Sequence, residues 1–119
     1  MPLVDVTYDS TISTASLRRL GELLPALVAE SVDCPEEPWT GPPEVGDIEI
    51  RFHAKGEFDV GYLNCIIEVK TRLFASRAED KQRRVDLIRD QLSATVELGT
   101  VGVWLILLEG AWAQTGSAN

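Results

Sequence analysis

The sequence repeats one pattern, an extended segment, a helix and a second extended segment, in two halves of similar length. The first half covers residues 2–55 and the second covers residues 60–109, within a single domain that spans residues 1–119. Right-handed crossovers in both halves would place the two helices on the same face of a four-stranded sheet. The order therefore predicts an α/β (α+β) fold with duplicated β-α-β units, a mixed sheet and two helices on one face.

The first half contains two predicted strands and one predicted helix. A strand is expected over residues 2–8, and Ser13 or Thr14 is expected to cap the helix that follows. Pro25 interrupts the helical spacing of apolar residues and would kink this helix. The segment 45–55 alternates as a half-buried strand does, and its polar face carries Glu49, Arg51 and His53.

The second half also begins and ends with a strand. The segment 62–71 is expected to pair with the strand at 45–55 through a hairpin-like connection, or to be offset from it as in a β-α-β arrangement. The run 101–108 is apolar on both faces, which predicts a fully buried central strand. Two helices cover only one sheet face, so the apolar second face predicts burial against further copies of the chain.

Between these strands, a capping box predicts where the second helix begins. Ser76 and Glu79 have the spacing S-x-x-E, which marks a helix start, and the helix is expected to run to about Glu97. Gly99 suits its C-terminal cap. Earlier in the chain, the segment 34–43 holds four prolines and is longer than a simple connection. This segment either lines a site or an interface, or is an insertion without such a role.

The acidic composition excludes several classes of partner. Eleven basic residues stand against nineteen acidic ones, and the resulting net charge of −8 argues against nucleic acid and anionic membranes. An anionic substrate would need a local cluster of arginines. Cys34 and Cys65 lack a metal-like or C-x-x-C spacing, which indicates ordinary thiols, with Cys65 in the core. The sequence has no phosphate-binding glycine loop and no metal constellation, so no cofactor is expected.

The same composition and the start of the chain bear on localisation. The longest apolar run, 101–108, is too short to span a bilayer, and the start lacks the features of a signal peptide. A cytoplasmic protein is therefore expected.

Pro2 offers chemistry at the start of the first strand. Removal of Met1 would convert the nitrogen of Pro2 from an amide into a secondary amine. A free α-amino group titrates near pKa ~7.7–8, and desolvation lowers that value. Such an amine would be a general base near neutral pH. The alternative is that Pro2 has no role beyond permitting removal of the methionine.

The chain resembles the tautomerase superfamily, and most closely its 5-carboxymethyl-2-hydroxymuconate isomerase group. The resemblance depends on the order and spacing of a few residues rather than on identity. These are Pro2, the segment Ile50-Arg51-Phe52-His53, Arg72, Ser76-Arg77 and Leu87-Ile88. It implies a homotrimer, a pocket at the sheet edge between subunits, and Pro2 as the base that moves a proton within an enol.

The resemblance also implies how a small-molecule carboxylate would be bound. Arg72 matches a family arginine that holds a substrate carboxylate, and its alternative role is a surface charge. Arg51 is either a second clamp or a salt-bridge partner of Glu49. His53 is either a site residue or a structural one. Arg77 lies at a predicted helix start, where the helix dipole disfavours a cation; this position weakly indicates a binding role and is equally compatible with solvent exposure. Glu49 stands where the family usually has an arginine and would repel a second carboxylate, so a monocarboxylate or another enol is also compatible.

Three functions remain open from the sequence. The first is a tautomerase, or isomerase, that acts on an enol or 2-hydroxydienoate with neutral Pro2 as base. The second is dehalogenase- or decarboxylase-type hydration chemistry with cationic Pro2, for which Glu109 is the candidate to activate water. The third is a non-catalytic oligomeric scaffold, which a retained Met1 would favour because an acylated proline nitrogen has no basicity.

Overall fold

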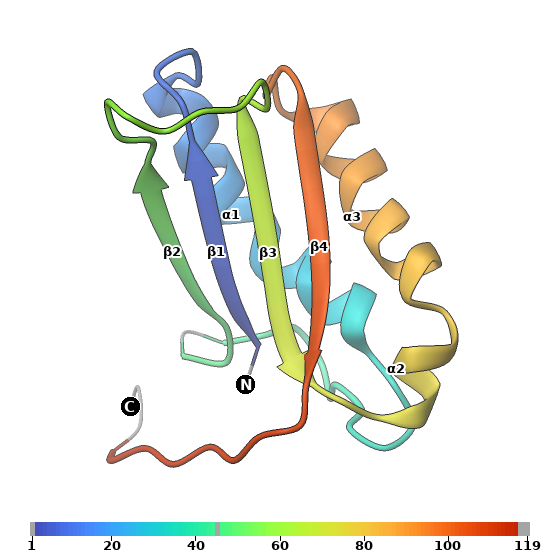
Figure 1. Cartoon of the computed structure of the whole chain (residues 1–119). Helices are drawn as coiled ribbons and strands as arrows, with labels where there is room; N and C mark the ends of the chain where they lie inside the picture. The colour runs from blue at the N-terminus through green and yellow to red at the C-terminus, as the bar shows by residue number, and fades with distance from the viewer. Residues whose placement is uncertain (1, 45, 117–119) are drawn as a thin grey trace.

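The computed structural model describes residues 2–44 and 46–116, and these form one four-stranded sheet (Figure 1). The sheet order is β2-β1-β3-β4. Strands β1 and β2 are parallel, β3 and β4 are parallel, and the antiparallel pair β1–β3 joins the two halves. The four strands are β1 (Leu3–Tyr8), β2 (Glu49–Ala54), β3 (Cys65–Arg72) and β4 (Val101–Leu108).

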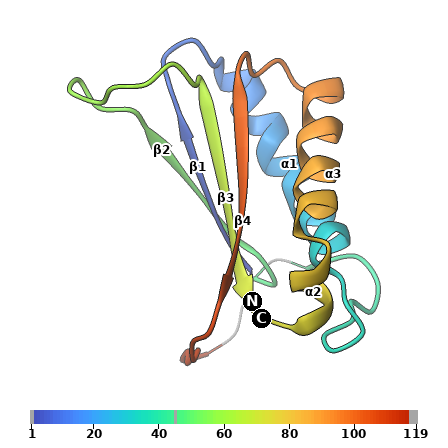
Figure 2. The same ribbon diagram turned by 45° about the vertical axis from the view of Figure 1, so that its right-hand side comes forward.

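The helices lie together against one face of this sheet (Figure 2). They are α1 (Thr14–Val32), α2 (Ala75–Glu79) and α3 (Lys81–Thr95). Each half is a β-α-β unit whose two strands are parallel, as the repeated sequence pattern predicts. The predicted fold class is therefore confirmed. None of the helices in residues 2–44 and 46–116 is long and apolar enough to cross a membrane.

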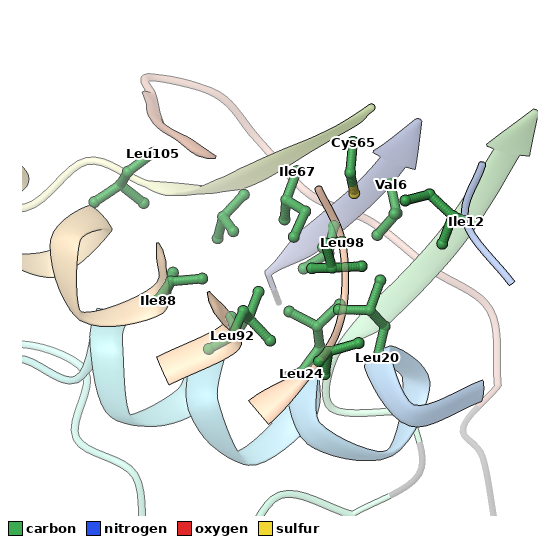
Figure 3. Close-up of a cluster of buried hydrophobic side chains, with 14 of the residues drawn as sticks. Val6, Ile12, Leu20, Leu24, Cys65, Ile67, Ile88, Leu92, Leu98 and Leu105 are labelled. Atoms are coloured by element: carbon green, nitrogen blue, oxygen red, sulfur yellow. The ribbon is translucent and has the colours of Figure 1, made fainter. Parts of the chain in front are cut away.

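The core lies between the sheet and the two long helices. Figure 3 shows Leu20 and Leu24 of α1 and Ile88 and Leu92 of α3 gathered below Ile67 of β3. All five side chains are fully buried, and burial of each contributes about 1.5–3 kcal/mol. Burial also raises the pKa of the Cys65 thiol to about 11, consistent with its predicted core position.

Helix α1 begins where the sequence predicts. Ser13 is its N-cap, and the Ser13 hydroxyl accepts a hydrogen bond from the backbone N–H of Ser16 at 3.1 Å. The helix continues through Pro25 and ends at Val32. Its buried leucines and valines share one face and belong to the core between the helices and the sheet.

The hairpin-like pairing expected for the second and third strands is wrong. Strand β1 lies between β2 and β3 and pairs with both, which is the offset β-α-β alternative. The physical reason is burial: Val4 and Val6 of β1 are fully buried, so β1 takes a central position. Sequence proximity of two strands does not outweigh this gain in buried apolar area.

The prediction of a central strand at residues 101–108 is also wrong. Strand β4 is at the end of the sheet order, and Trp104 on it is 66% exposed. Its second apolar side belongs to the sheet face that the helices leave uncovered. A strand that is apolar on both faces can therefore be buried inside its own domain, or it can present one apolar face for contact with another molecule.

The second helix differs from its prediction at both ends. Ser76 is inside α2, whose N-cap is Phe74, and the Ser76 hydroxyl donates to Glu36 instead of capping the helix. Asp80 separates α2 from α3, so the expected single helix is broken. Gly99 has a φ of 64° but follows the C-cap of α3, Val96, by three residues. It forms the turn into β4 rather than the helix cap.

Candidate functional site

The start of β1 and the ends of β3 and β4 meet at one end of the sheet (Figure 1). Because β1 is antiparallel to β3, Leu3 pairs with Lys70. Because β4 is parallel to β3, Arg72 pairs with Leu108 at the strand ends. The fold thus brings Pro2 and Arg72, which are seventy positions apart in the sequence, to the same end of the sheet.

A cavity of about 530 Å³ occupies this end of the sheet. Its wall combines the start of β1, the end of β3 and the segment that follows β4. Glu37, from the proline-rich loop at residues 34–43, forms part of the wall. The lining residues are Leu3, Glu37, Lys70, Thr71, Arg72, Leu108, Gly110, Ala111 and Trp112.

Pro2 lies beside this cavity through its neighbour Leu3. Pro2 is buried, and its carbonyl oxygen accepts a hydrogen bond from the backbone N–H of Glu49 at 3.2 Å. That bond extends the β1–β2 pairing by one residue and holds the start of the chain against β2. Met1 lies outside the described residues.

Arg72 and Lys70 bring two positive charges to the cavity wall. The Arg72 side chain is exposed, and its guanidinium carbon lies 5.4 Å from the centre of the Phe74 ring. The Lys70 ammonium lies 3.4 Å from a carboxylate oxygen of Asp5. The sequence reasoning selected Arg72 and missed Lys70. An alternating strand shows which residues share a face, but only the register shows that Lys70 lies next to Leu3.

Arg51 lines a second, smaller cavity of about 140 Å³. Leu3 and Trp112 belong to the walls of both cavities, so the two are neighbours. The Nε atom of Arg51 lies 3.5 Å from the carboxylate of Glu49, and both side chains are largely exposed. The salt bridge that the sequence left open is therefore present, and Glu49 offsets the charge of Arg51.

His53 belongs to a polar row across the uncovered sheet face. Its Nε2 atom lies 2.8 Å from Asp5 Oδ1. The hydrogen bond from His53 lowers the pKa of Asp5, with Lys70 adding to the effect and burial opposing it. Asp5 is a residue that the sequence analysis missed, because its partners come from β2 and β3 and follow only from the strand order.

The side chain of Arg77 binds groups of the protein itself, which contradicts the weak indication from the sequence that it binds a ligand. Its side chain is fully buried, and it donates to the backbone carbonyls of Val32 at 2.7 Å and Arg72 at 3.0 Å. A third bond runs to the Glu37 carboxylate at 3.2 Å. Arg77 therefore ties α1, the end of β3 and the proline-rich loop together.

The proline-rich loop at residues 34–43 forms part of the wall of the larger cavity and contacts α2. Glu36 accepts hydrogen bonds from Ser76, and Glu37 both pairs with Arg77 and lines the larger cavity. Glu109, the carboxylate suggested for water activation, is exposed directly after β4. Within the described residues, no group of three or more His, Cys, Asp or Glu side chains is arranged to hold a metal ion.

Comparison with solved structures identifies the architecture as the tautomerase fold. A structure described as a fused 4-OT wild-type symmetric trimer matches with a TM-score of 0.61 and 19% identity, over 98% of this chain and 95% of the other. MIF2 of Leishmania major matches with a TM-score of 0.55 and 11% identity, over 98% of this chain and 96% of the other. No protein-family model matches the sequence. The comparison with curated proteins found no match either.

Proposed function

We propose that this protein is a cofactor-free tautomerase in which the amine of Pro2, exposed by removal of Met1, is the general base. The observation that carries the proposal is the 530 Å³ cavity, where Leu3, next to Pro2, shares a wall with Lys70 and Arg72. A weakly basic amine beside two cations suits a substrate that has a transferable proton and a carboxylate. The fold shared with the 4-OT structure supports the same reading.

The proposed reaction moves one proton within the substrate. Neutral Pro2 nitrogen removes the proton from the enol oxygen, and the O–H bond pair stays on oxygen to give a dienolate. A carbon–carbon double-bond pair of the dienolate then takes the proton from the Pro2 ammonium, so that a C–H bond and the carbonyl form together and the amine is restored. Arg72 binds the carboxylate and draws negative charge from the reacting carbons while the dienolate exists.

The charges around the site favour a substrate with one carboxylate. Lys70 and Arg72 line the larger cavity, whereas Arg51 in the smaller cavity is paired with Glu49. A second carboxylate near Arg51 would meet the negative charge of Glu49. We therefore place a monocarboxylate enol ahead of the dicarboxylate that the hydroxymuconate isomerase group would imply.

We further propose that the protein acts as a homotrimer whose subunits cover the bare sheet face. Trp104 and Leu108 of β4 are exposed on the uncovered side of the sheet, and Phe58, Val60 and Tyr62 are exposed in the connection between β2 and β3. Large apolar side chains exposed on a sheet face that no helix covers are typical of an interface. The similar 4-OT structure is described as a symmetric trimer, which supports the number of subunits.

One observation favours hydration chemistry as a second candidate. This reaction needs a carboxylate to activate water and a Pro2 amine that is protonated at neutral pH. Glu37 supplies a carboxylate on the wall of the larger cavity, held there by Arg77. The pKa of the Pro2 amine separates the two candidates, since a tautomerase base must be neutral at the working pH and a hydration acid must be charged.

The first experiment is the intact mass of the untagged protein, followed by assays with phenylenolpyruvate and 2-hydroxymuconate. We expect a mass short by one methionine and measurable ketonisation of one of the two enols. Pro2→Ala should lower kcat by roughly 10²- to 10⁴-fold, whereas Pro38→Ala in the exposed part of the loop serves as the matched control. A full-length mass, or a Pro2→Ala variant that keeps wild-type activity, would contradict the proposed mechanism.

A further inference from the structure

The hydroxyl of Thr71 stands out among the buried polar groups. The residue is 3% exposed, and its Oγ1 atom has no hydrogen-bond partner among the residues that the structure describes. Thr71 also lines the 530 Å³ cavity at the end of β3. Leaving a buried hydroxyl unpaired is destabilising, so such a group at a cavity wall points to a partner that occupies the site in the working protein.

The register of β1 and β3 indicates which group that partner is. Leu3 pairs with Lys70 and Val4 pairs with Val69, so one further step along the two strands sets Pro2 opposite Thr71. Both are buried, and each lies two positions from a member of the buried Val4–Val69 pair, so both belong to the same sheet face. Residues that face each other across an antiparallel pair have Cβ atoms roughly 4.5–5.5 Å apart. A threonine hydroxyl at that separation reaches a group on the opposite residue.

We propose that the Thr71 hydroxyl is the hydrogen-bond partner of the Pro2 amine and positions that nitrogen at the cavity wall. The inference rests on the proposed function, because only removal of Met1 creates the amine. A hydroxyl oxygen suits both states of the base: it accepts a hydrogen bond from the single N–H of the neutral amine, which leaves the lone pair free for the enol proton, and it accepts from the ammonium after proton transfer. Thr71 is thus a positioning residue, and it fixes the base during both halves of the proton transfer.

The proposed contact also changes the protonation of the amine in a defined direction. A hydrogen bond to the charged ammonium is stronger than one to the neutral amine, so the Thr71 hydroxyl favours the protonated form. Removing the hydroxyl should therefore lower the pKa of the Pro2 amine by roughly 0.5–1. The charged side chains that line the two cavities remain unchanged in such a variant; they are Glu37, Lys70 and Arg72 in the larger one and Asp5, Glu49 and Arg51 in the smaller one.

The test compares Thr71→Val, which keeps the shape and removes the hydroxyl, with Thr71→Ser, which keeps the hydroxyl. The pKa of the Pro2 amine is measured by NMR titration of protein that contains isotopically labelled proline, and kcat/KM for phenylenolpyruvate is measured across pH. Thr95→Val is the matched control, because its hydroxyl bonds the Gln91 carbonyl near the end of α3, away from the cavity. Thr71→Ala provides a second hydroxyl-free variant should the valine fail to fold.

We expect Thr71→Val to lower the amine pKa and to move the pH profile of kcat/KM with it, while Thr71→Ser and Thr95→Val keep wild-type values. An unchanged amine pKa in both hydroxyl-free variants would overturn the inference and would mean that water satisfies the hydroxyl. In that event wild-type turnover that depends on Pro2 would leave the proposed function intact. A retained Met1 would overturn both, because no amine would exist.

Discussion

The Nε2 atom of His53 lies 2.8 Å from Oδ1 of Asp5, a contact that crosses from β2 to β1 on the uncovered face of the sheet. Lys70 of β3 lies 3.4 Å from the other oxygen of the same carboxylate. One acidic residue on the central strand therefore joins three strands. The polar row formed by His53, Asp5 and Lys70 also lies next to the two cavities, since Lys70 lines the larger cavity and Asp5 lines the smaller one.

We expect the Asp5 contacts to make stability dependent on acid pH. The pKa of Asp5 in the folded protein lies below its ordinary value of 3.8, first because of the bond from His53. Its stabilising contribution is therefore complete above pH 3.8 and is lost as the pH falls through the lower folded value. Asp5→Asn should remove this part of the acid dependence when the free energy of unfolding in urea is measured at neutral and acid pH.

The exposed Asp90 on α3 gives the matched control for this measurement. Its carboxylate contacts only the exposed neighbour Arg89 among the described ion pairs, so Asp90→Asn should leave the acid dependence close to that of the wild type. Equal acid dependence in the wild type and in Asp5→Asn would show that the row across the sheet contributes nothing measurable to stability.

Arg72 should govern substrate affinity if the proposed function is right. Replacing it with Gln removes a charge-assisted, bidentate partner for the carboxylate, and the expected rise in KM for phenylenolpyruvate is about 10- to 100-fold. Arg89→Gln on α3 is the matched control, because Arg89 is exposed and pairs only with aspartates on the same helix. A KM for Arg72→Gln equal to that of the control would remove Arg72 from the carboxylate site.

Arg77 should matter for stability far more than a surface arginine. Arg77→Met leaves the buried carbonyl of Val32 and the partly buried carbonyl of Arg72 without their donor, and we expect a loss of about 2–5 kcal/mol in the free energy of unfolding. Arg19→Met breaks only an exposed pair with Glu22 and should cost less than about 1 kcal/mol. Similar values for the two variants would argue against the tethering role that the contacts of Arg77 suggest.

Trp104 provides the test of self-association. Trp104→Lys places a charge on the uncovered sheet face, so light scattering during size-exclusion chromatography should report monomers for this variant and the expected trimer for the wild type. Gln82→Lys introduces the same side chain at an exposed position of α3 and should leave the assembly unchanged. A monomeric wild type, or a trimeric Trp104→Lys, would contradict the proposed interface.

Much of the secondary structure followed from the sequence, because it depends on interactions between near neighbours. The alternation at Glu49, Arg51 and His53 correctly assigned the polar face of β2, and the Ser13 cap correctly located the start of α1. The capping box at Ser76 misled because this hydroxyl donates a hydrogen bond to Glu36, forty positions away, instead of capping the helix. A local motif cannot report such competition.

The two β-α-β units and the apolar surface that each element must bury follow from the order of residues alone, since spacing along the chain sets which side chains share a face. The strand order, and with it the candidate site, depends on tertiary packing. Placing β1 between β2 and β3 sets Leu3 beside Lys70, gives Asp5 its two partners and brings Glu37 to the cavity. These contacts join residues from different strands and loops, and their formation depends on how the whole core packs rather than on any segment alone.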